Sequence, residues 1–295
     1  MNKAISRRRL LQSFSLTPFL AGSISAVGQE TQPSSPVKGR IRQAVTYGLG
    51  NLRRIPLTEL APQLLEMGIV GLDLVNPEEW EAVQKTGLIV TLSRAPDPQE
   101  KVGMVNGFNH MEHHDPLLEL YSDLIPRAGK AGIKQIICFS GNRRGKSDDE
   151  GIQNCITGLK RVMPIAEKHA VTLVMELLNP IGHRDYHADR TEFGAQIARG
   201  IDSEHFKLLY DIYHMQVSEG NLIDTIRKHR DVIGHYHTAG CPGRRDLDEH
   251  QEIFYPAVMR AIVETGFTGF VAHEFSPKNQ ENLQSLRDAV KVCDV

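Results

Sequence analysis

Four residues that can bind a metal or transfer a proton stand at the ends of four successive apolar segments of the chain. They are Glu176, Asp211, His237 and Glu274. Gaps of 35, 26 and 37 residues separate them, each close to the length of one strand–helix unit. If the side chains meet, three carboxylates and one imidazole share a small volume, which is costly unless a cation lies between them. Because most of the donors are oxygens, one hard divalent ion such as Mg²⁺ or Mn²⁺ is expected.

The apolar segments that precede these residues belong to a longer series, which begins at residue 41. Most are continuously apolar rather than alternating, as is typical of parallel strands buried on both faces. We therefore predict eight strands, at residues 43–47, 71–75, 88–92, 135–139, 171–177, 207–210, 233–238 and 269–275.

Amphipathic stretches separate these strands and predict helices. The helices are expected at residues 56–67, 116–130, 148–169, 191–199, 222–229, 253–262 and 280–292. Strand then helix, repeated eight times, predicts an α/β fold, a (β/α)₈ TIM barrel that forms a single domain over residues 41–295. A doubly wound open sheet is the alternative, which eight units and the lack of a glycine-rich phosphate loop after the first strand disfavour. In a barrel, reactive groups gather at the carboxyl ends of the strands, where the four residues stand.

The first 28 residues have the layout of an export signal. A basic head with Lys3 and Arg7–Arg9 precedes an apolar stretch and a run of small residues. The pair Arg7–Arg8 resembles the twin-arginine signal, so we expect an exported, periplasmic protein, with residues 29–40 as a flexible linker. The apolar stretch is shorter than the roughly 20 residues that a spanning helix needs, so no stable membrane span is expected after processing. An ordinary secretory signal and an uncleaved anchor are the alternatives.

The charge of the remaining chain argues against nucleic acid as a partner. Residues 1–28 carry four basic and no acidic side chains, which leaves 30 basic and 36 acidic ones in the rest. Nucleic-acid affinity depends on clustered Lys and Arg, and this balance is mildly acidic. The four cysteines show no C-x-x-C spacing, so neither a zinc knuckle nor a redox pair is indicated. A homo-oligomer remains open.

Several segments in the second half of the chain resemble the hydroxypyruvate isomerase family of the xylose-isomerase-like TIM barrels, to which the tagatose-type sugar epimerases are related. The resemblance covers roughly residues 41–290 and is strongest in the segments at 207–216, 219–222, 235–244, 252–256 and 274–277.

This resemblance assigns roles to individual residues. It places the family's metal ligands on the four residues named above. It implies that His214 contacts a substrate oxygen, that Arg244 faces the anionic or hydroxyl end of the substrate, and that Asn109 belongs to a loop lining the pocket. Hydroxypyruvate isomerases often have Gln at the third ligand position, whereas the epimerases have His, so His237 is a departure.

The expected activity is the isomerisation of a small α-hydroxycarbonyl substrate, hydroxypyruvate or tartronate semialdehyde, through a cis-enediolate. Glu176 and Glu274 are the expected acid/base pair. One alternative is a 3-epimerase of a free ketose, because returning the proton to the opposite face of the same carbon is epimerisation. A second is a non-catalytic exported carbohydrate-binding barrel. A phosphodiester-cleaving barrel resembling endonuclease IV is disfavoured, because it needs more histidines at strand ends.

Overall fold

The computed structural model describes residues 38–280 and 283–295. The predicted signal peptide, residues 1–28, lies outside the described residues, as do residues 29–37 of the predicted linker. In the described ranges, no helix combines the length and the apolarity needed to cross a bilayer.

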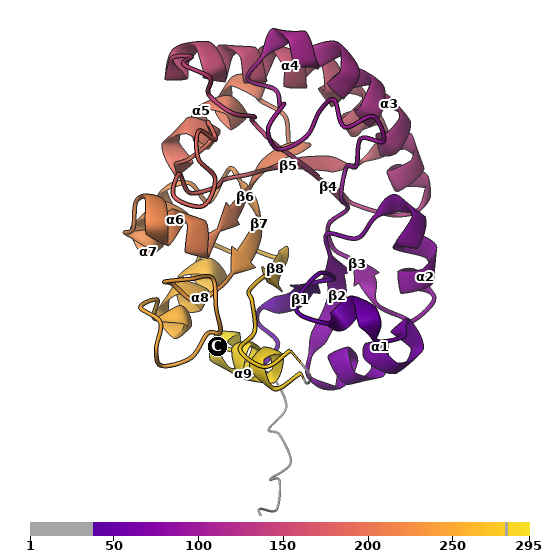
Figure 1. Ribbon diagram of the computed structural model, residues 1–295, viewed down its shortest axis with the longest axis vertical. Helices are drawn as coiled ribbons and strands as arrows, with labels where there is room; N and C mark the ends of the chain where they lie inside the picture. Colours follow the sequence, from indigo (N-terminus) through magenta and orange to yellow (C-terminus); the bar gives the residue numbers. More distant parts are fainter. Residues whose placement is uncertain (1–37, 281–282) are drawn as a thin grey trace, which may run out of the picture. The chain divides into compact units, whose positions relative to one another are not determined.

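Eight parallel strands form one curled sheet with helices on its outer side (Figure 1). The strands are β1 (Arg42–Thr46), β2 (Ile69–Asp73), β3 (Ile89–Val90), β4 (Gln135–Cys138), β5 (Thr172–Glu176), β6 (Phe206–Asp211), β7 (Ile233–Thr238) and β8 (Phe270–His273). Their order in the sheet is β3-β2-β1-β8-β7-β6-β5-β4. The first strand thus pairs with the last, as in a barrel, and the doubly wound alternative is wrong.

The sheet closes between β3 and β4 through a single residue. Ser93, just beyond β3, donates its N–H to the carbonyl of Gln135 (2.9 Å) and accepts from the N–H of Ile137 (3.0 Å). The ladder of β3 itself has only two residues, fewer than the predicted 88–92. Pairing continues past it in irregular form, since the N–H of Thr91 still donates to the carbonyl of Leu72 at 2.9 Å.

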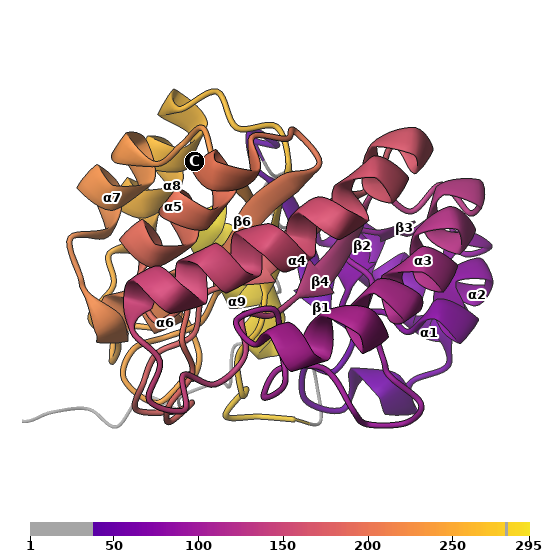
Figure 2. The ribbon, with the colours of Figure 1, turned by 90° about the horizontal axis from the view of Figure 1, so that it is seen from above.

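Helices follow most strands and cover the outside of the sheet (Figures 1 and 2). The α-helices are α1 (Leu57–Glu66), α2 (Trp80–Gln84), α3 (His114–Lys130), α4 (Asp148–His169), α5 (Thr191–Ile201), α6 (Ile212–Ser218), α7 (Leu222–Lys228), α8 (Tyr255–Glu264) and α9 (Gln284–Cys293). Short 3₁₀ turns lie at η1 (Leu52–Arg54), η2 (Pro77–Glu79) and η3 (Met111–His113). Two of these helices, α2 and α6, are missing from the sequence prediction.

The ends of α4 show why its predicted bounds match the structure. The side chain of Ser147 accepts the N–H of Glu150 at 3.2 Å, which satisfies one of the free donors at the start of the helix. Acidic residues fill the first turn, where the helix dipole favours them. At the other end Ala170 adopts a left-handed conformation (φ 51°) and ends the helix.

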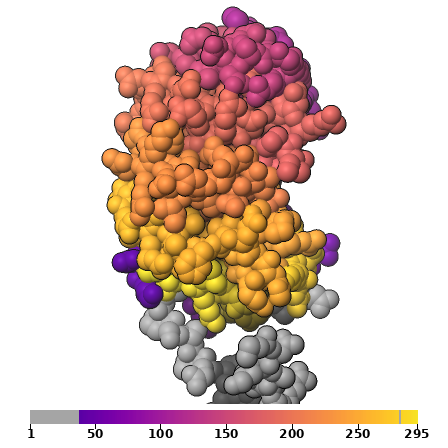
Figure 3. All heavy atoms as spheres, turned by 90° about the vertical axis from the view of Figure 1, so that its left-hand side faces the viewer, coloured from indigo at the N-terminus to yellow at the C-terminus, as the bar shows by residue number. Residues whose placement is uncertain are grey.

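Two apolar layers hold the sheet. The outer layer packs helices against strands; in α9 the buried residues recur at helical spacing, as Leu286, Ala289, Val290 and Cys293. The inner layer fills the inside of the barrel with Leu74, Leu92, Ile137, Val174 and Leu209. In Figure 3 the atoms on this face follow one another in chain order, from magenta through orange to yellow. The four cysteines are buried and free.

Candidate metal centre and active site

The structure brings the four predicted metal ligands together at the carboxyl ends of the strands. Glu176 ends β5, Asp211 ends β6, His237 is next to last in β7, and Glu274 directly follows β8. One ligand atom from each side chain lies within 4.8 Å of those of the other three. Asp211 and His237 are completely buried. Side chains separated by up to 98 residues thus share one small volume, as their spacing predicts.

Asp73, the last residue of β2, orients the imidazole of His237. Its Oδ2 lies 2.8 Å from His237 Nε2, and its Oδ1 accepts the hydroxyl of Thr91 at 2.5 Å. The proton on Nε2 is thereby fixed, so Nδ1 faces the carboxylates of Glu176 (3.7 Å) and Glu274 (2.7 Å). A carboxylate behind a histidine is the usual partner of a metal-binding imidazole. Asp73 is not among the predicted site residues, although an acidic residue within the predicted apolar strand 71–75 is a signal for it.

A second histidine, His235, lies beside the carboxylate of Asp73. The amide nitrogen of Gln135 donates to the carbonyl of Gly234 (2.9 Å), so its Oε1 accepts Nδ1–H of His235 (2.7 Å). His235 Nε2 lies 3.2 Å from Asp73 Oδ1. Burial alone would raise the pKa of the Asp73 carboxyl, but the two histidines outweigh it and lower that pKa. Asp73 is therefore a fixed negative charge beneath the centre.

Arg244 supplies positive charge to the carboxylates. Its Nη2 donates to Asp211 Oδ2 (2.9 Å) and to Glu274 Oε2 (2.7 Å). Burial would raise the pKa of Glu274, but the charges of His237 and Arg244 outweigh it and lower that pKa. Burial dominates at Glu176 and, with the charge of Glu274, raises its pKa. The pKa values of the two glutamates are therefore shifted in opposite directions, although both side chains line the same cavity.

A tight turn presents Arg244 to the centre. Gly240 and Arg245 exchange backbone hydrogen bonds of 2.8 and 3.2 Å across it, and the carbonyl of Arg244 accepts the N–H of Ser276 (2.8 Å). A Cβ on Gly240 would lie 2.2 Å from the carbonyl oxygen of Asp246, so only glycine fits there. Arg244 itself has a φ of 54°, which is uncommon for a residue with a side chain.

His214 has a defined tautomer because of its neighbours. Its Nδ1 lies within hydrogen-bond distance of two donors of Asn179, the backbone N–H (3.1 Å) and the side-chain amide (2.6 Å). Nδ1 is therefore the acceptor and the proton is on Nε2, which has no hydrogen-bond partner among the described residues. Burial lowers the pKa of His214 to about 4, so the ring is neutral near pH 7. The side chain of Asp211 accepts the backbone N–H of His214 (3.1 Å) and caps α6.

These residues fit a hard divalent cation. Three carboxylates and one imidazole nitrogen form a mostly oxygen donor set. Buried His237 Nδ1 faces that set and makes no well-aligned hydrogen bond among the described residues, despite its close approach to Glu274. A lone pair aimed at carboxylates needs a proton or a metal ion between them.

A cavity of about 310 Å³ opens above this centre. Its lining combines apolar side chains, among them Leu74 and Ile137 of the inner layer, with polar ones: Asn76, Arg94, Glu176, His183, Arg244 and Glu274. A second cavity of about 220 Å³ shares Arg94, Arg244 and Glu274 with it. Arg94 follows the predicted strand 88–92 and is not among the predicted site residues.

The structure places Asn109 away from this cavity. Its side-chain amide donates to the carbonyl of Asn142 (2.7 Å) and lies 3.0 Å from His187 Nδ1, and the residue is completely buried. Asn109 is not among the residues that line either cavity at the centre. Its assignment to substrate binding stays a prediction.

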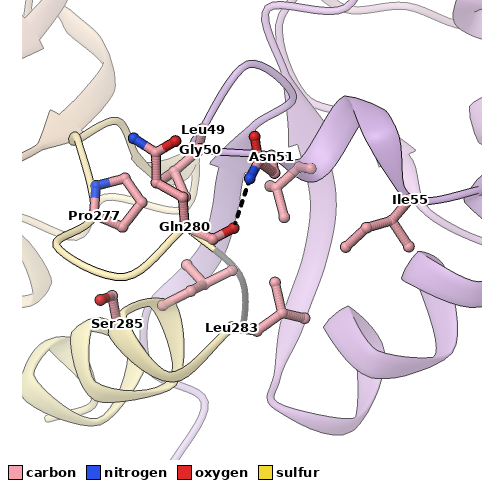
Figure 4. Close-up of a pocket in the computed structure, with 10 residues that line it drawn as sticks. Leu49, Gly50, Asn51, Ile55, Pro277, Gln280, Leu283 and Ser285 are labelled. Atoms are coloured by element: carbon pink, nitrogen blue, oxygen red, sulfur yellow. Dashed lines mark hydrogen bonds between the residues drawn. The ribbon is translucent and has the colours of Figure 1, made fainter.

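Another hollow lies beside η1 and α9, where Asn51 donates to the carbonyl of Gln280 at 3.0 Å (Figure 4). Its volume is about 20 Å³, and its lining contains no titratable side chain. A space close to that of one water molecule cannot hold a substrate, so the candidate site is the cavity above the four ligands.

Comparison with known proteins places the chain in a family. A family model described as Xylose isomerase-like TIM barrel matches residues 54–293. A Drosophila melanogaster protein with the name "Putative hydroxypyruvate isomerase" is 24% identical over 198 residues, 67% of this chain and 75% of that protein. Hydroxypyruvate isomerase of Escherichia coli K12 is 28% identical over 148 residues, 50% of this chain and 57% of that protein.

Two further proteins extend this result. 2-Oxo-tetronate isomerase of Cupriavidus necator is 29% identical over 125 residues, 41% of this chain and 48% of that protein. A solved structure described as AP endonuclease, family 2, from Brucella melitensis has a TM-score of 0.72 at 18% identity and covers 83% of this chain and 97% of that one. At this identity the structural likeness concerns the fold alone.

The matches to the two bacterial relatives span about half the length of each. The names of these relatives nevertheless agree with the predicted enzyme class, an isomerase, and the predicted family is confirmed. The chain belongs to the xylose isomerase-like TIM barrel family.

Proposed function

We propose that the protein is a divalent-metal-dependent isomerase of a small α-hydroxycarbonyl acid, of the hydroxypyruvate or tartronate semialdehyde type. The observation that carries the proposal is the convergence of Glu176, Asp211, His237 and Glu274 within 4.8 Å at the mouth of the barrel. The names of the curated relatives supply the class of substrate.

The four donors would hold Mg²⁺ or Mn²⁺, which supplies a Lewis acid that polarises the substrate carbonyl. The glutamates perform the proton transfer. Glu274, with its lowered pKa, is ionised and can accept the proton from the carbon next to the carbonyl. Glu176 lines the same cavity and can return a proton to the neighbouring carbon. A proton moved from one carbon to the next through a cis-enediolate is an aldose–ketose type isomerisation.

His214 assists by stabilising charge on oxygen. Its Nε2–H has no partner among the described residues and lies 3.7 Å from Asp211 Oδ2, beside the donor set. A neutral imidazole with a fixed N–H can donate to the substrate oxygen as negative charge develops.

Replacement of Glu274 by Gln tests the proposal. E274Q keeps the shape of the side chain but cannot accept a proton, so exchange of substrate hydrogen with deuterated solvent should fall about 10²- to 10⁴-fold. The matched control is Glu192→Gln on α5, where Glu192 pairs with Lys228 on the surface (3.0 Å). Unchanged exchange in metal-loaded E274Q would remove the assigned role.

A second candidate, a 3-epimerase of a free ketose, is favoured by His237, since the related epimerases have His at this position. Chiral analysis of the products from hydroxypyruvate and from a panel of free ketoses separates the two activities. Binding of a sugar with no deuterium uptake would favour a non-catalytic barrel.

We further propose that residues 1–28 are a signal peptide that directs export of the protein. A reporter fused behind residues 1–40 should reach the periplasm, and replacement of Arg7 and Arg8 by Lys should abolish this if the twin-arginine route is used.

A further inference from the structure

We propose that Arg94, and not Arg244, binds the carboxylate of the substrate and selects an acidic substrate over a neutral sugar. This inference rests on the proposed function and names the residue that reads the anionic end of the substrate.

The charge of Arg244 is already balanced. One of its terminal nitrogens donates to both Asp211 and Glu274, at 2.9 and 2.7 Å. The positive charge of Arg244 is thus shared by two carboxylates of the centre. A substrate carboxylate beside Arg244 would also lie next to these carboxylates, which is costly. Arg244 can still donate to a neutral oxygen, because its buried Nε has no hydrogen-bond partner among the described residues.

Arg94 makes no ion pair of this kind with the described residues. Its Nε donates to the carbonyl of Leu74 at 3.0 Å, which orients the guanidinium. Within residues 38–280 and 283–295, its two terminal nitrogens make no hydrogen bond or ion pair. A guanidinium held at Nε presents these two nitrogens as a fork that matches the two oxygens of a carboxylate.

The position of Arg94 suits a substrate that also reaches the metal centre. Arg94 lines both cavities together with Glu274, and the larger one contains Glu176 as well. At roughly 30 Å³ per non-hydrogen atom, the share of a water molecule in the liquid, about 310 Å³ holds about ten such atoms. A three- or four-carbon hydroxy-oxo acid fits, with its hydroxycarbonyl end at the glutamates and its carboxylate at Arg94.

Two ligands that differ only at one end test this inference. Hydroxypyruvate and dihydroxyacetone share a hydroxyl next to a carbonyl, but the first carries a carboxylate where the second carries a hydroxymethyl group. Dissociation constants of both are measured by calorimetry on the Mn²⁺-loaded full chain, beside their rates of deuterium exchange. For R94Q, the preference for hydroxypyruvate over dihydroxyacetone in binding should fall about 10- to 100-fold, the range for a lost hydrogen bond to a charged group.

Two further variants complete the design. R94K keeps the charge without the fork or the bond to Leu74 and should restore part of the preference. The matched control is Arg161→Gln, because Arg161 pairs with Asp115 between α4 and α3 (2.7 Å), lines neither cavity and should leave the preference unchanged. Arg94 is exposed, so the melting temperature of R94Q should stay that of the wild type.

The outcomes separate this inference from the proposed function. If R94Q weakens the binding of both ligands equally, or of neither, Arg94 does not bind the substrate carboxylate. If the wild type binds hydroxypyruvate but exchanges no hydrogen, the isomerase proposal fails, while the binding ratio of R94Q still decides the role of Arg94. If the wild type binds neither ligand, both proposals fail.

Discussion

Asp73 at the end of β2 fixes the imidazole of His237 in β7 by a hydrogen bond of 2.8 Å, across 164 positions of the sequence. The carboxylate holds the proton on Nε2 and directs Nδ1 to the centre. We expect D73N to lower Mn²⁺ affinity about 10- to 100-fold, the usual effect of losing such a partner. Calorimetric titration with Mn²⁺ measures it, with Asp115→Asn as a surface control. Wild-type affinity in a folded D73N protein would show that Asp73 does not tune the site.

The protonation of His237 should couple metal binding to pH. Burial would lower the pKa of this imidazole, but the neighbouring Glu274 and the bond to Asp73 raise it well above its ordinary value. Without metal, Nδ1 therefore carries a proton near pH 7, and Mn²⁺ must displace it. We expect affinity for Mn²⁺ to rise with pH and at least one proton to be released per ion. Calorimetry in buffers of different ionisation enthalpy counts the protons, and a count of zero would contradict this account.

The tautomer of His214 gives a prediction about rate. N179D keeps an oxygen that can accept the N–H groups of Ile181 and Gly182, as Asn179 does at 3.0 and 2.7 Å. The new carboxylate replaces the closer of the two donors at His214 Nδ1 by an acceptor, while the backbone N–H at 3.1 Å remains. The acceptor favours a proton on Nδ1 and thus disfavours the tautomer with the proton on Nε2. Deuterium exchange should fall about 10- to 100-fold. Nitrogen NMR of the imidazole shows whether the tautomer has changed; normal exchange with the changed tautomer would remove His214 from the mechanism.

His273, buried between the sheet and α9, should make folding stability depend on pH. Its Nε2 lies 2.9 Å from Gln43 Oε1 and its Nδ1 lies 2.8 Å from the hydroxyl of Thr238. Burial lowers its pKa to about 3, from the ordinary histidine value of 6.5. In the unfolded chain, His273 therefore binds a proton below about pH 6.5, whereas in the folded protein it binds one only below about pH 3. The contribution of neutral His273 to the free energy of unfolding is fully present above about pH 6.5 and is lost as the pH falls from about 6.5 to about 3.

Between pH 7 and pH 5 this one group should cost about 2 kcal/mol of unfolding free energy, at roughly 1.4 kcal/mol per pH unit below about 6.5. Urea unfolding of the metal-free wild type and of H273Q at both pH values measures the difference. If H273Q does not fold, proton NMR of His273 in the wild type replaces it, and a titration midpoint near the ordinary histidine value of 6.5 would refute the prediction.

The sequence predicted local features of this fold better than its long-range pairings. The bounds of β7 and α4 match the predicted ones. For α4 the reason is local, because the capping Ser147 and the left-handed Ala170 mark its two ends in the sequence. Helix α6 was missed because its seven residues directly follow β6, with Asp211 serving both elements. A cap of this kind leaves no loop in the sequence to mark the boundary.

The candidate site shows the same limit. The four ligands were predictable because each stands at the end of its own strand, at regular spacing. The partnership of Asp73 with His237 depends instead on side chains that meet across the barrel interior, which no spacing along the chain expresses. Likewise, Arg244 forms ion pairs with two carboxylates from different parts of the chain, Asp211 and Glu274. Only the structure could show that its guanidinium already has these partners.

The seam at Ser93 has a practical consequence. Where β3 and β4 meet through one residue, the barrel wall has its fewest hydrogen bonds, and opening there should need less free energy than separating β5 from β6. Trp80, the one tryptophan of the sequence, donates its indole N–H to the hydroxyl of Ser93 at 3.1 Å. The protein thus contains a built-in fluorophore at the weakest point of its wall, and its emission can report opening without any added label.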